Sequence, residues 1–106
     1  MRVIVKHNKT QQEAIQQVDR MAEDLVKGIV GGPVQLVDQR KSWNGNTMDF
    51  GFTGKMGFFS APVRGSVTVN PHDVVIDIEL PDIVKKFMPE EKIKQSVEAK
   101  AHKMLQ

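Results

Sequence analysis

The chain contains no cysteine and no long apolar run. Without cysteine there is no disulfide, no thiolate nucleophile and no metal site built on sulfur, so the fold depends on its core. A membrane-spanning helix needs roughly 20 consecutive apolar residues, and no segment approaches that length. The first residues, 1–7, carry an apolar stretch too short for a signal peptide. We therefore expect a cytoplasmic protein with no transmembrane segment.

An excess of one charge is also missing. The formal net charge is only +2, from 15 Lys and Arg against 13 Asp and Glu, and the two signs are interspersed along the helical segments. This pattern is typical of solvated helix faces, so we expect no nucleic-acid partner. With 106 residues, of which 40% are hydrophobic, the chain has the size and composition of a single globular domain covering residues 1–106.

Two parts of the chain have the apolar spacing of amphipathic helices. The first begins at a capping box, residues 10–13, and is expected to continue as one helix to the Gly-Gly-Pro stop at 31–33. Near the other end, Asp82 is expected to cap a single helical turn. Met88 should break that turn, because a proline follows and disfavours helical angles. That proline is expected to open the last helix, 89–105.

Alternation with a period of two predicts strands at 2–7, 34–42, 47–53, 63–70 and 74–80. The Asn44-Gly45 pair predicts a tight hairpin turn in which both residues have positive φ. The glycine-interrupted segment 55–61 predicts a bend or a bulge.

The element order β-α-β-β-β-β-α predicts an α+β fold. We expect a two-layer sandwich in which a mostly antiparallel, curved sheet is covered on one face by two helices. Strong curvature around the last helix would make it helix-grip-like. The pattern does not decide where the first strand joins the sheet, and an unpaired edge strand would favour a homodimer.

The residue patterns predict no catalytic residue, no metal site and no cofactor. The three histidines lie on different elements and lack metal-ligand spacing. Asp77 and Glu79 share a strand face, where exposure to solvent is the simplest interpretation. The glycine-rich segment 51–57 lacks both the Gly-Lys-Ser/Thr ending and the following helix of a phosphate loop. We therefore expect a protein that is not an enzyme.

Aromatic and methionine side chains supply the candidate binding residues. Phe50 and Phe52 share the strand face of Met48, which favours core packing over an RNA-stacking surface. The apolar cluster at 56–61 lies beside glycines and is expected to leave apolar area exposed. A tryptophan beside the hairpin turn either caps the end of the core or presents an exposed contact. The candidate binding residues are Trp43, Met56, Phe58 and Phe59.

The capped first helix, the 43–46 hairpin, the segment 50–57 and the 74–80 strand leading into Pro81 together resemble a known family. The chain is similar, over nearly its whole length, to small bacterial proteins described as polyhydroxyalkanoic acid system proteins. The genes of that family lie beside those for making and using storage granules of polyhydroxyalkanoate, a polyester. No catalytic residues come with the resemblance.

The resemblance implies a non-enzymatic accessory or interaction protein of polyhydroxyalkanoate metabolism. Its expected partner is a polyhydroxyalkanoate granule or a granule-associated protein. The alternative is a binding protein for a hydrophobic small molecule, held in a pocket between the C-terminal helix and the sheet. The six methionines of the chain would give such a pocket adaptable walls, although they can equally fill gaps in the core.

Overall fold

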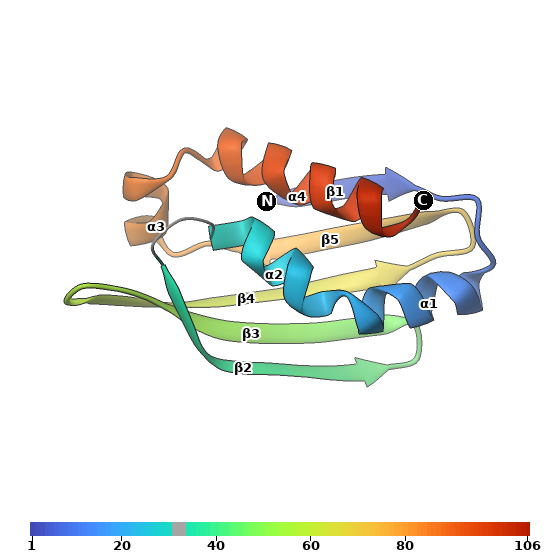
Figure 1. Ribbon diagram of the computed structural model, residues 1–106, viewed down its shortest axis with the longest axis horizontal. Helices are drawn as coiled ribbons and strands as arrows, with labels where there is room; N and C mark the ends of the chain where they lie inside the picture. Colours follow the sequence, from blue (N-terminus) through green and yellow to red (C-terminus); the bar gives the residue numbers. More distant parts are fainter. Residues whose placement is uncertain (31–33) are drawn as a thin grey trace.

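The computed structural model describes residues 1–30 and 34–106. Within these residues the elements are β1 (Arg2–Lys6), α1 (Gln11–Arg20), α2 (Ala22–Val30), β2 (Gln35–Asn44), β3 (Thr47–Met56), β4 (Phe59–Val69), β5 (Asp73–Glu79), α3 (Asp82–Phe87) and α4 (Glu90–Met104). The strands form one sheet, and the helices lie on one side of it (Figure 1). The predicted α+β two-layer sandwich is confirmed.

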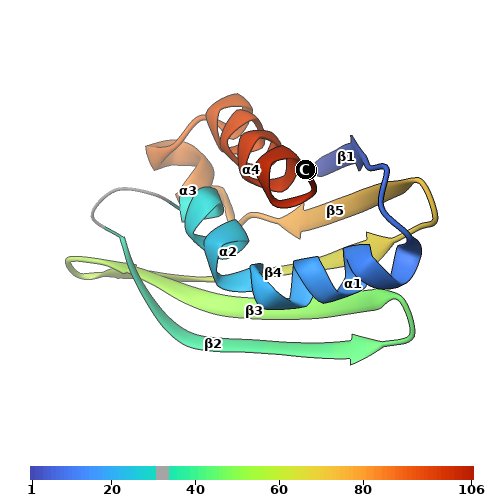
Figure 2. The ribbon, with the colours of Figure 1, turned by 45° about the vertical axis from the view of Figure 1, so that its right-hand side comes forward.

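The sheet is antiparallel throughout, with the strand order β1-β5-β4-β3-β2. The N-terminal strand β1 therefore lies at one edge beside β5, and β2 forms the other edge. The sheet is curved and does not close on itself (Figure 2). Helix α4 lies over the side of β1 and β5, while α1 and α2 lie over β3 and β4 (Figures 1 and 2).

The core lies between the helices and the inner face of the sheet. Phe50 and Phe52 of β3 are 6% and 1% exposed, which confirms that both pack in the core. Ile76 on β5 and Ile93 on α4 are fully buried in the same cluster. The period-two and helical apolar patterns therefore meet in one continuous interior.

The first helix is interrupted at Met21, where a single helix was predicted. Its capping box forms as expected: the Thr10 hydroxyl accepts from the Glu13 backbone N–H at 3.1 Å, and the Glu13 carboxylate accepts from the Thr10 N–H at 3.2 Å. Met21 leaves helical geometry, with φ −106° and ψ 15°. No proline or glycine marks this break, so packing on the curved sheet rather than local propensity accounts for it. The predicted helix stop at 31–33 lies outside the described residues.

The N-terminal ends of the last two helices each differ by one residue from the prediction. Met88 is extended, with φ −134° and ψ 119°, and breaks the helical run as expected. The N-cap of α3, however, is Pro81, so Asp82 is the first helical residue and not the cap. Pro89 likewise is the N-cap of α4, with ψ 133°, and Glu90 opens the helix. The prolines have the extended ψ of a cap, although their φ would also suit the first helical position.

Of the bend or bulge predicted at 55–61, the bulge is wrong: the segment is the tip of a long hairpin, and the chain reverses there in a tight turn. Met56 on β3 pairs with Phe59 on β4, and the two-residue turn between them begins with Gly57 at φ 61°. The pairing of β3 with β4 has no register shift. The sheet does contain a bulge, but on β2: Val37 pairs with Thr53 and Arg40 with Gly51, which leaves one extra residue on β2.

The β2–β3 turn is also displaced by one residue from the prediction. Asn44 pairs with Thr47, so the two loop residues are Gly45 and Asn46. Gly45 has φ 62°, whereas Asn44 and Asn46 are not at positive φ. A glycine at the first loop position is the requirement of a type II′ hairpin turn, in which only that residue needs positive φ.

Candidate interaction surface

The outer end of the β3–β4 hairpin carries two of the three large apolar side chains that are exposed among the described residues. We call residues 55–60 the hairpin tip. Phe58, in the turn, is fully exposed at 106%, and Phe59 is 52% exposed. Met56 is half-buried. Figures 1 and 2 show that this hairpin extends past the ends of the helices, so the helical layer does not cover its tip.

The tip continues the pattern of the buried strands beyond the point where the helices end. On β3, Met56 has the same parity as Phe50 and Phe52, which face the core. Phe59 lies directly across from Met56, and paired residues of an antiparallel sheet project from the same face. Both side chains therefore lie on the helix-facing side of the sheet, but outside the helical cover. The same strands supply core residues at one end and exposed apolar residues at the other.

Trp43 lies at the opposite end of this hairpin system. It pairs with Met48, which is eight residues before Met56 on β3, or about 26 Å along an extended strand. Its ring is half-buried against the core, and its indole Nε1–H donates to Asp19 Oδ1 at 2.8 Å. The structure thus groups Met56, Phe58 and Phe59 but places Trp43 elsewhere. A binding role for Trp43 stays a prediction.

Asp19 connects the end of α1 to the edge strand β2. Its carboxylate pairs with Lys41 Nζ at 2.9 Å and accepts the Trp43 indole proton, while Lys41 also donates to the Asp19 backbone carbonyl at 2.9 Å. The hydrogen bond from Lys41, followed by that from Trp43, lowers the pKa of Asp19 below its usual value. Sequence reasoning missed this cluster because its members lie more than 20 residues apart.

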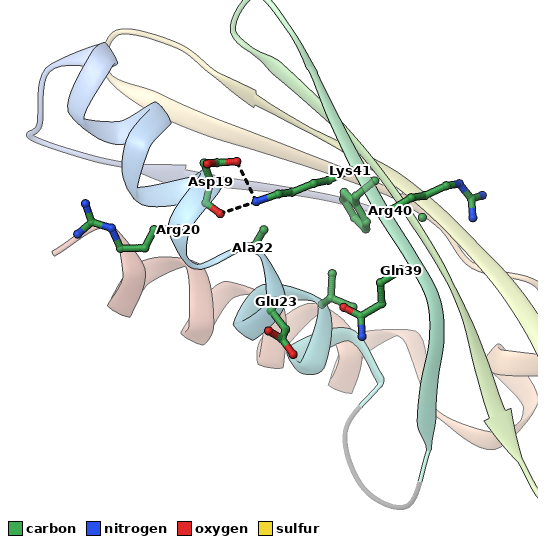
Figure 3. A pocket seen from close by; sticks show the side chains of 10 residues that line it. Asp19, Arg20, Ala22, Glu23, Gln39, Arg40 and Lys41 are labelled. Carbon is green, nitrogen blue, oxygen red and sulfur yellow. Dashed lines mark hydrogen bonds and ion pairs between the residues drawn. The ribbon is translucent and has the colours of Figure 1, made fainter.

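An open groove of about 310 Å³ lies beside this cluster, between the α1–α2 junction and β2. Figure 3 shows Lys41 reaching Asp19, whereas Arg20 and Arg40 point away on opposite sides. Polar groups therefore do not converge on a common point, as they do in a site that orients a ligand. The groove is lined by Asp19, Arg20, Ala22, Glu23, Val26, Gln39, Arg40, Lys41, Phe50 and Gly51.

The inner face of α4 packs closely on the rest of the core. Ile93, Val97 and Ala101 are fully buried, and Met104 is 2% exposed. Two of the six methionines, Met48 and Met104, are thus core residues. A hydrophobic ligand between this helix and the sheet stays a prediction.

The side chains of His7 and His102 each have a hydrogen-bond partner. His7 is 6% exposed; its Nδ1 accepts the Lys9 backbone N–H at 3.2 Å, so Nε2, 2.9 Å from the Asn70 carbonyl, carries the proton. His102 lies on the exposed side of α4 and contacts Gln106. Within residues 1–30 and 34–106, no three histidine or carboxylate side chains gather as metal ligands would.

No helix in the described part of the chain has both the length and the apolar character needed to cross a membrane. The structure defines a small antiparallel α+β domain in which two of the three exposed large apolar side chains of the described residues lie at one hairpin tip. Comparison with known protein families then assigns the chain to one of them. The family model described as "Putative polyhydroxyalkanoic acid system protein" matches residues 1–105, and the chain belongs to this family.

The family match confirms the resemblance found in the sequence and links the chain to polyhydroxyalkanoic acid systems. No curated protein and no solved structure matched the chain.

Proposed function

We propose that this chain is a non-enzymatic, cytoplasmic accessory protein of polyhydroxyalkanoate metabolism that attaches to storage granules through its hairpin tip. Membership of the polyhydroxyalkanoic acid system family supports the biological setting. The observation that supports the tip as the contact site is the full exposure of Phe58 at the end of a projecting hairpin.

Physical considerations favour the tip as a contact. Burying a phenylalanine side chain is favourable by about 1.5–3 kcal/mol, and Phe58 gains none of this in the isolated domain. The tip is held by a ladder that runs without interruption from Thr47 to Met56 on β3. A side chain presented on an already ordered turn loses little backbone entropy when it binds.

Sedimentation of purified granules with the protein tests this role. We expect the wild-type protein in the granule pellet and the Phe58→Ser variant largely in the supernatant. Ile4→Ser is the matched control, because Ile4 is also exposed, at 59%, but lies on β1 at the far edge of the sheet. Wild-type protein that stays in the supernatant would contradict granule attachment, and equal pelleting of Phe58→Ser would contradict the role of the tip.

A further inference from the structure

We propose that the hairpin tip binds an anionic lipid surface, with the aromatic side chains inserted among acyl chains and Lys55 at the headgroups. This inference rests on the proposed function, in which the tip makes the granule contact, and it specifies the chemistry of the surface that is met there. Three features of the hairpin support it: its charge, the placement of Lys55, and its small size.

The hairpin is depleted of negative charge. All 13 acidic residues of the chain lie outside residues 50–72, although that segment makes up more than a fifth of the sequence. The same segment contains Lys55 on β3 and Arg64 on β4, and both side chains are exposed. The rest of the chain mixes both signs, so this stretch is the part of the protein that an anionic surface would attract.

The placement of Lys55 matches the geometry of an interface. Lys55 pairs with Ser60 and so faces the outer side of the sheet, opposite Met56 and Phe59. It lies only three residues before the fully exposed Phe58. A lysine beside an inserted aromatic side chain can extend its ammonium to the headgroup level while its stem contacts apolar atoms.

The size of the tip argues against a protein partner, and its charge argues against bare polymer. A stable protein interface buries about 800 Å² on each partner, which is more than a turn with two exposed aromatic residues can supply. Insertion into a lipid layer needs no shape complementarity. A polyester chain is neutral along its length, so bare polymer would gain nothing from a cation beside Phe58.

Flotation with vesicles tests the inference on the intact protein. The probes are vesicles of equal parts phosphatidylglycerol and phosphatidylcholine, vesicles of phosphatidylcholine alone, and protein-free polyhydroxybutyrate particles. We expect binding to the anionic vesicles at least about tenfold tighter than to the neutral ones, because a cation near an anionic surface is attracted to it. Binding should weaken as salt is raised, since salt screens that attraction.

Variants separate the apolar and electrostatic contributions. Phe58→Ser should weaken binding to anionic vesicles by about tenfold or more. Lys55→Gln should weaken it by about fivefold and reduce the salt dependence, and Lys55→Glu should weaken it further. The matched control is Lys92→Gln, which removes one exposed cation from α4 and should leave binding unchanged. Circular dichroism of each variant checks that the fold is retained.

Several outcomes would overturn the inference, and they can be told apart from failure of the proposed function. Equal binding to both kinds of vesicle, or full binding by Lys55→Glu, would exclude an anionic lipid surface. Binding to protein-free polymer but not to vesicles would identify polymer as the target and leave granule attachment intact. Binding to granules only when granule proteins are present would identify a protein partner. Absence from granules altogether would refute the proposed function itself.

Discussion

The contact between Phe50 and Gly65 in the middle of the sheet leads to a quantitative prediction for Gly65→Ala. Gly65 lies opposite Phe50 on the neighbouring strand, and its missing side chain would point into the core. A Cβ placed there would overlap Phe50 Cζ and lie 2.6 Å from the backbone oxygen of Asp77. The ring could rotate only within a filled interior, and the backbone oxygen belongs to the paired strand β5, so neither contact is easily relieved.

The expected size of the effect follows from two opposing contributions. Overpacking a filled core costs about 1–3 kcal/mol, and two simultaneous clashes, one of them with backbone, place this site at about 3 kcal/mol. Replacing glycine with alanine also restricts the unfolded chain, which returns about 0.4–1 kcal/mol. We therefore expect Gly65→Ala to lower the free energy of unfolding by about 2 kcal/mol. For a domain of this length that corresponds to a fall in Tm of about 8 °C.

Urea denaturation followed by circular dichroism measures this difference. Gly51→Ala is the matched control, because Gly51 also lies within a paired strand, β3. The atoms nearest to its Cβ would belong to the guanidinium group of Arg40, with Cζ at 2.8 Å, and this far end of an exposed, flexible side chain can move away. The same substitution should thus destabilise at 65 and have little effect at 51. An unchanged urea midpoint for Gly65→Ala would refute the packing argument.

Two further predictions concern the β2 edge. Because Lys41 and Trp43 lower the pKa of Asp19, its carboxylate contributes stability that is present above its unfolded pKa and lost as pH falls through the folded value. The free energy of unfolding should therefore fall less for Asp19→Asn than for wild type between about pH 5 and 2. The difference should be under about 1 kcal/mol, because the pair is half-exposed. Equal falls in the two proteins, measured by urea titration at each pH, would contradict this. Asp38 has φ 54°, so Asp38→Gly should raise the unfolding free energy by up to about 1 kcal/mol, and a lower urea midpoint would contradict that.

Features of the fold that are encoded by neighbouring residues could be predicted from the sequence. The capping box at Thr10 formed as expected because its donors and acceptors all lie within four residues. The alternation of Val67 and Val69 with polar residues likewise gave the inner face of β4 correctly. The break at Met21 was missed because no residue there disfavours a helix, and the curved sheet that it follows is built from strands later in the chain.

Glycine was the main source of error, because one residue type serves several purposes. The glycines of 55–61 predict a bend or a bulge, whereas Gly57 provides the positive φ of a two-residue hairpin turn. The actual bulge at Asp38 has no glycine to indicate it.

The candidate surface could be predicted only in part. Apolar composition beside glycine was enough to single out Met56, Phe58 and Phe59, which the structure gathers at the hairpin tip. The partner of Trp43 could not be found in this way. Asp19 reaches it across 24 residues, through the docking of α1 on β2, and that docking depends on the whole sheet.

The bulge on β2 also affects how copies of the protein behave when they are crowded together. A free strand edge can recruit the same edge of another molecule only along a regular row of donors and acceptors. On β2 that row is divided at Asp38 into two short runs, 35–37 and 40–44. At the other edge, β1 offers only five residues, with Arg2 and Lys6 at its ends. Molecules concentrated side by side on a common surface would therefore tend to stay separate instead of joining their sheets into fibres.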